Sequence, residues 1–313
     1  PGFPQLDADL RKLTEQAVTD SANGNSYNGY ISYWPKPKNG LFKNDSTGEV
    51  IGVSVQEYPK YYYVKDSVNS FKNEMNNFLK NDMVLYKSDS FFFDNGLKGY
   101  RFTLRDTGSS RTINRVIMLK GNYRYSLVAS GDTLTEQSTF LNNFFKSFVP
   151  LKKDNAPGIY NNHLADFFTD LFSKDSAVRS KARQSIPNVY YGEKGIPMIM
   201  DAISKLNITD KDYFETKTKL IAELGYIKDS IRQEVVVDLK KIYEQTADTS
   251  LFQNEVFKSL ARHKTIVAYA LFRELILQDP PIFENSYDYT SLFSILDDSL
   301  QLSKALFPDL LQL

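Results

Sequence analysis

The chain contains no cysteine, and other residue types that carry chemistry are scarce. Without cysteine there is no disulfide, no thiolate metal ligand and no cysteine nucleophile. Only two of the 313 residues are histidines, His163 and His263, and neither lies in a metal-ligand pattern such as HExxH. We expect His263 to close a helix, where basic side chains commonly meet free carbonyls. We expect His163, which follows a linker, to be a solvated surface residue.

Net charge and long apolar runs are also missing. Lys+Arg and Asp+Glu each number 38, so the formal net charge is zero and the chain as a whole has no electrostatic preference for nucleic acid or an anionic membrane. No apolar run approaches the roughly 18 residues that a membrane-spanning helix requires. Phosphate-binding glycine loops, nucleophile elbows and EF-hand loops are absent. We therefore expect no cofactor, no metal and no enzyme activity within these residues, although an acid and base pair of carboxylates has no sequence signature.

The stretch from Gly99 to Ala129 predicts an antiparallel meander. Aromatic and aliphatic residues alternate with polar ones from Tyr100 to Arg105, and strand-forming residues resume from Thr112 to Lys120. Period-two alternation indicates strands with one buried face. The two-residue connection Gly121-Asn122 predicts a tight hairpin. Further strands are predicted at residues 27–34, 51–55, 83–86 and 91–93, and helices at residues 5–22, 64–78 and 133–148, the last with Thr133 and Glu136 at capping-box spacing.

Beyond Pro157-Gly158, strand signals disappear and helical periodicity takes over. Apolar residues recur in helical pairs, and Ile186, Leu224 and Leu260 align at intervals of 38 and 36 residues, close to one helical hairpin per unit. The Trp/Gly/Tyr pattern of tetratricopeptide repeats is absent, so the series looks like a HEAT-type α-solenoid. Pro280-Pro281 breaks it before two further predicted helices. Because Leu302–Leu313 reads as the opening of another helix, we expect the chain to be a fragment.

These patterns predict an α+β fold, an antiparallel sheet covered by helices, followed by an all-α helical-repeat domain. The expected organisation is an N-terminal helix and linker at residues 1–25, the α+β domain at 26–153, and the repeats at 154–313. The order of elements, together with the segments Gly96–Phe102 and Phe140–Phe148, resembles the PsbP-like α/β/α sandwich family over residues 26–150. That resemblance implies a binding or assembly role and carries over no site residues.

Two surfaces are candidates for contact with other molecules. In the aromatic run from Tyr58, the residues Tyr61, Tyr62 and Tyr63 either form a surface for a glycan or small ligand, or lie on a strand covered on both sides. In the repeats, the second helix of each pair would line a concave surface. Its candidate contact residues are Lys205, Arg232, Lys240, Lys241 and Arg273.

Asp followed by Ser or Thr recurs at positions where helices begin. The pattern, for example Asp132-Thr133-Leu134 and Asp175-Ser176-Ala177, is similar to the O-glycosylation acceptor of some bacterial envelopes, but helix capping explains it without a sugar and is the favoured interpretation. We interpret the chain as a non-catalytic protein-interaction or scaffold region of a larger bacterial envelope protein, with a protein partner. Location in the periplasm or envelope is favoured, and a cytoplasmic location stays open.

One alternative is an accessory region of an enzyme whose catalytic domain lies outside this chain. The ending Leu302–Leu311 resembles long envelope proteins that carry a TraB/GumN-type domain upstream, although no TraB motif is present here. The other alternative is glycan or small-ligand binding through the tyrosine run.

Overall fold

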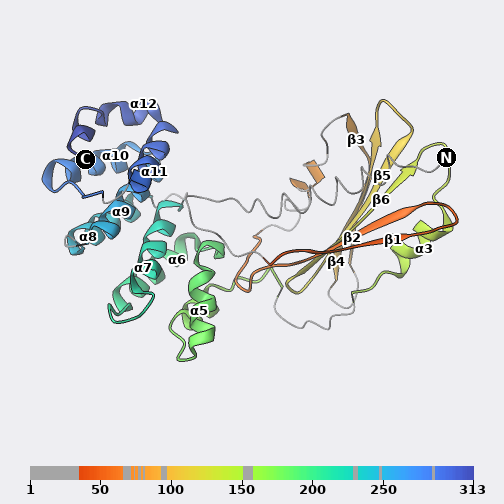
Figure 1. Cartoon of the computed structure of the whole chain (residues 1–313), viewed down its shortest axis with the longest axis horizontal. Coiled ribbons are helices and arrows are strands. Elements are labelled where there is room, and N and C mark those ends of the chain that lie inside the picture. The colour runs from red at the N-terminus through yellow and green to blue at the C-terminus, as the bar shows by residue number, and fades with distance from the viewer. Residues whose placement is uncertain are drawn as a thin grey trace. The chain divides into compact units, whose positions relative to one another are not determined.

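The computed structural model describes residues 35–65, 72–73, 75–76, 79, 82–92, 97–150, 158–227, 232–246, 249–283 and 286–313. The chain divides into two compact units, Pro1–His163 and Leu164–Leu313 (Figure 1). The first unit contains an antiparallel sheet and the second is helical, which confirms the predicted fold class. The expected elements at residues 1–25 and 27–34 lie outside the described residues.

Six strands form one antiparallel sheet in the order β1-β2-β6-β5-β4-β3. The predicted meander is present as β4, β5 and β6, with each strand paired to the next. Gly121, with φ +55°, takes the first central position of the β5–β6 turn, where type II′ turns require glycine. The bounds are β1 Lys38–Lys43, β2 Val50–Glu57, β3 Met83–Phe92, β4 Lys98–Asp106, β5 Arg111–Lys120 and β6 Tyr123–Asp132.

Three features of this unit differ from the sequence-based expectation. β1 was not predicted, because its six residues lack the alternation of apolar and polar side chains that indicates a strand. Its two large apolar residues, Leu41 and Phe42, are adjacent and the rest of the segment is polar or glycine. The two strands expected at residues 83–86 and 91–93 form a single strand, β3, because polar residues are tolerated on an exposed edge strand. The predicted capping box at Thr133 and Glu136 is wrong: helix α3 (Thr139–Ser147) is capped by Ser138, whose Oγ accepts a hydrogen bond from the Leu141 amide at 3.2 Å.

Each face of the sheet carries its own apolar cluster. On one face, Leu141 and the phenylalanine stripe of α3 pack against β2, β5 and β6, including the fully buried Ile51 and Leu127. On the other face, Phe102, Ile117 and neighbouring side chains pack with Met75, which belongs to the described part of the helix predicted at residues 64–78. The sheet is therefore covered from both sides, but α3 covers only part of its face.

The second unit consists of helices joined by short connections. The predicted break at Pro280-Pro281 lies between α10 and α11. The segment from Leu302 forms short helical turns instead of a further long helix. The bounds are α4 Leu164–Leu171, α5 Ser176–Gln184, η1 Ile186–Asn188, α6 Gly192–Lys205, α7 Tyr213–Gly225, α8 Arg232–Gln245, α9 Ser250–His263, α10 Ile266–Gln278, α11 Ser286–Asp297, α12 Leu300–Ser303, η2 Lys304–Leu306 and η3 Asp309–Gln312.

Helix α9 is the centre of this unit, because it contacts α7, α8, α10 and α11. Its buried surface includes charged side chains, which are costly to bury unless they are paired. Arg262 Nη1 donates to Glu255 Oε1 at 2.6 Å, and Lys258 Nζ donates to Asp288 Oδ1 of α11 at 2.5 Å. These ion pairs satisfy the buried charges of α9 and tie it to α11.

The contact between α7 and α9 leaves no room for a side chain at Gly225. A Cβ at this position would lie 2.7 Å from Ser259 Cα, so a backbone would have to move. We predict that Gly225→Ala lowers the free energy of unfolding by about 1–3 kcal/mol, as overpacked core positions do. Urea unfolding measures the change. Gly108→Ala, whose nearest contact would be an ordinary 3.6 Å, is the control and should change stability by less than about 0.5 kcal/mol.

Burial raises the pKa of the Glu223 carboxyl from 4.5 to about 8; the nearby Arg262 lowers it and Glu255 raises it. The folded chain therefore binds more protons than the unfolded chain between these pH values, and stability falls as pH rises through them. We predict that Glu223→Gln flattens the pH dependence of the free energy of unfolding between about pH 5 and 8. Urea unfolding across this range tests it. An unchanged slope, or an equal change in the exposed-site variant Glu234→Gln, would contradict the assignment.

Candidate functional site

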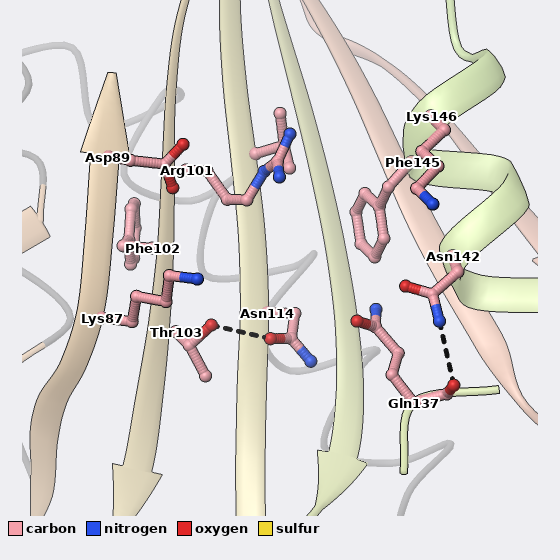
Figure 2. A pocket seen from close by; sticks show the side chains of 11 residues that line it. Lys87, Asp89, Arg101, Phe102, Thr103, Asn114, Gln137, Asn142, Phe145 and Lys146 are labelled. Atoms are coloured by element: carbon pink, nitrogen blue, oxygen red, sulfur yellow. Dashed lines mark hydrogen bonds between the residues drawn. The ribbon is translucent and has the colours of Figure 1, made fainter. Parts of the chain in front are cut away.

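A groove lies on the sheet face that α3 occupies, between that helix and exposed side chains of β3 and β4 (Figure 2). Its volume is about 240 Å³. Strands β3, β4 and β5 form its floor, and the segment from Gln137 into α3 forms one wall. The residues that line it are Lys87, Asp89, Arg101, Phe102, Thr103, Asn114, Val116, Gln137, Asn142, Phe145 and Lys146.

The strand register explains why polar side chains gather on this floor. Alternate residues of a strand share one face, and directly paired residues on neighbouring strands lie side by side. The apolar cluster under α3 ends at β5, so the same face becomes polar over β4 and β3. Two rows cross the three strands, Lys87–Thr103–Asn114 and Asp89–Arg101–Val116.

The groove lining carries more positive than negative charge. Lys87, Arg101 and Lys146 contribute three cations, whereas Asp89 contributes the one carboxylate. Asp89 lies directly opposite Arg101 in the strand pairing, so these two charges offset one another. Lys87 and Lys146 are exposed and have no ion-pair partner among the described residues. The groove therefore has a net positive potential from its two lysines.

Hydrogen bonds fix the amide side chains that face the groove. Thr103 Oγ1 donates to Asn114 Oδ1 at 2.8 Å, which leaves the Asn114 amino group available to another acceptor. Asn142 Nδ2 donates to the Gln137 carbonyl oxygen at 2.9 Å, which leaves the Asn142 carbonyl available to another donor (Figure 2). The Gln137 side chain lies beside the half-buried ring of Phe145. The site thus offers both donors and acceptors next to an aromatic ring.

This lining suits binding better than bond-making chemistry. General acid–base catalysis needs positioned groups of matched pKa. Glycosidase-type catalysis needs two carboxylates, whereas the groove lining has one, Asp89. Thr103 donates to an amide oxygen and not to a base. Across the described residues no three His, Asp or Glu side chains are grouped so that they could hold a metal ion.

The tyrosines singled out in the sequence lie elsewhere in the first unit. Tyr61 is only 2% exposed and belongs to the core, while Tyr62 and Tyr63 are half-buried. The ring of Tyr62 stacks on Tyr58 with centroids 4.9 Å apart and planes 4° apart. Burial raises the pKa of the Tyr58 hydroxyl to about 12, although the charge of Arg124 opposes this shift. These rings pack mainly against the protein, so they do not form one continuous aromatic platform.

The basic residues singled out in the repeats have partners within the chain. Lys205 pairs with Asp201 at 2.6 Å and Lys241 with Asp238 at 2.9 Å, each within its own helix. The side chain of Arg232 lies outside the described residues. The remaining two pairs join separate elements, α8 to α10 and α10 to η3. These pairs are Lys240–Glu274 at 2.6 Å and Arg273–Asp309 at 2.6 Å.

The sequence-based prediction is confirmed for the position of one histidine and wrong for the exposure of the other. His263 is the last residue of α9, as expected, and is 2% exposed. The expectation that His163 is solvated is wrong, because the residue is only 6% exposed. It directly precedes Leu164, the start of α4, which is itself buried.

The groove residues were not identified from the sequence as a site. The alternation in β4 does indicate that Arg101 and Thr103 share one face. Nothing in the sequence shows that Gln137 and Lys146 lie beside them, because that depends on where α3 crosses the sheet.

No family model matches the chain, and no curated protein matches it. Among solved structures, one described as lipid–protein interactions in lipovitellin is similar over 87% of this chain and 27% of that chain, at 10% identity and a TM-score of 0.24. The chain thus spans about a quarter of that structure's length, and a likeness this weak carries no argument about fold or function. Among the described helices none is long and apolar enough to cross a membrane.

Proposed function

We propose that this chain is a non-catalytic protein-interaction region of a larger bacterial envelope protein, and that the sheet groove is its contact site. The observation that supports this is the open, cationic lining of the groove, with exposed Lys87 and Lys146 and a single carboxylate, Asp89. Exposed charges around a shallow polar surface are typical of the rim of protein interfaces. The PsbP-like resemblance of the first unit agrees with a binding role.

The helical unit supports a scaffold role in the same proposal. Side chains join helices one repeat apart: Lys240 pairs with Glu274, and the Tyr243 hydroxyl donates to the Asp279 carbonyl oxygen. The bond from Lys240 also lowers the pKa of the Glu274 carboxyl. Nearest-neighbour contacts of this kind characterise helical-repeat arrays, which present extended surfaces to partners. We propose a HEAT-like arrangement for this unit on that basis.

Site-specific photocross-linking in the native host tests the contact site. We predict that p-benzoylphenylalanine at Asp89 or Gln137, on opposite sides of the groove, yields the same discrete cross-linked protein after illumination. The same residue at exposed Lys36, just before the opposite edge strand β1, is the control and should not yield it. Absence of an adduct from both groove positions, or an identical adduct from Lys36, would contradict the proposal.

The envelope location is a separate part of the proposal. One of the Asp-Ser/Thr sites, Asp132-Thr133-Leu134, is exposed and open to modification, whereas Asp175 of the site Asp175-Ser176-Ala177 caps α5 by accepting a hydrogen bond from the Ala177 amide at 2.8 Å. We predict that the protein is recovered in the periplasmic or membrane fraction of the native host. Intact mass of the recovered protein then shows whether a glycan is attached. Recovery in the cytoplasmic fraction, with an unmodified mass, would overturn the location.

A further inference from the structure

We propose that the groove binds an extended acidic segment of the partner, with a carboxylate held between Lys87 and Lys146. This inference rests on the proposed function and specifies the chemistry of the partner. Three observations support it, namely the charge of the lining, the orientation of its amides and its size.

The charge of the groove is complementary to a carboxylate. Asp89 offsets Arg101 across the β3–β4 pair, so two ammonium groups remain, one on β3 and one on α3. Two lysines left without an ion pair on either side of one groove attract a negative group and disfavour a basic one.

The amides of the groove complement a peptide backbone. The Asn114 amino group is left as a donor because its oxygen accepts from Thr103, and the Asn142 oxygen is left as an acceptor because its nitrogen donates to the Gln137 carbonyl. An extended peptide exposes an N–H and a C=O at each residue, which need such partners. A simple anion would use the donors and leave the Asn142 acceptor unused.

The size of the groove favours a segment of chain over an enclosed small molecule. Its volume of about 240 Å³ lies below the roughly 300–1,000 Å³ of typical ligand pockets, and five of its lining residues are exposed. The distance across three strands is roughly 10 Å, because neighbouring strands lie about 4.8 Å apart. About three residues of an extended peptide cover this distance. Phe145 provides an apolar wall for one neighbouring side chain.

The test uses the purified chain and the fluorescein-labelled peptide acetyl-Glu-Ala-Glu-Ala-Glu-Ala-Glu-amide, with fluorescence anisotropy at physiological ionic strength. We expect saturable binding that Lys87→Glu/Lys146→Glu weakens by about tenfold or more. The matched control is Lys36→Glu/Lys38→Glu, which makes the same charge change at exposed lysines by the opposite sheet edge and should leave affinity within about twofold. The peptide with Gln in place of Glu should bind weakly or not at all.

Side-chain amide NMR signals of Asn114 and Gln137 in the unaltered chain provide a second readout that does not depend on a variant folding. Both signals should shift on addition of the acidic peptide and not on addition of the Gln peptide. Equal weakening by both double variants, equal binding of the two peptides, or full competition by free glutamate would overturn the inference. A cross-linked partner in cells together with no acidic-peptide binding would reject this inference alone. Peptide binding without any cross-linked partner would instead reject the proposed function.

Discussion

The first unit is constrained by the difference in width between one helix and a six-stranded sheet. Strands spaced about 4.8 Å apart make the sheet roughly 24 Å across, whereas a helix with its side chains is about 10–12 Å wide. The nine-residue helix α3 therefore covers only part of its face, and its phenylalanine stripe fixes that part over β2, β6 and β5. The strands that α3 leaves uncovered, β3 and β4, carry polar residues on this face. The groove lies between these residues and the helix.

A different constraint organises the helical unit. Because each helix buries apolar area mainly against its neighbours, charged side chains at the contacts must find partners on the adjacent helices. Lys258 reaches Asp288, and Arg273 reaches Asp309. Of the basic residues that the sequence presents as outward contacts, Lys240 and Arg273 join separate helical elements, whereas Lys205 and Lys241 pair within their own helices. This moves the best candidate contact surface from the repeats to the sheet.

Local sequence patterns predicted much of the fold because the responsible interactions are local. Alternation and the Gly121-Asn122 turn fix the meander, and helical periodicity fixes most helices of the second unit. The features that the sequence did not predict depend on contacts between residues far apart in the chain. The polar middle of β3 is stable because it pairs with β4, and His163 is buried although the two residues before it, Asn161 and Asn162, are polar. The groove was missed for the same reason, since Lys87 and Lys146 come to line one groove only through the position of α3 on the sheet.

In the proposed complex, the part of the sheet that α3 leaves uncovered binds an acidic chain segment. A crystal structure of the chain grown with the acidic peptide tests it most directly. We predict peptide density across β3, β4 and β5, with a carboxylate between Lys87 and Lys146 and backbone contacts to Asn114 and Asn142. An empty groove with the peptide bound on the helical unit, or at another part of the sheet, would contradict it.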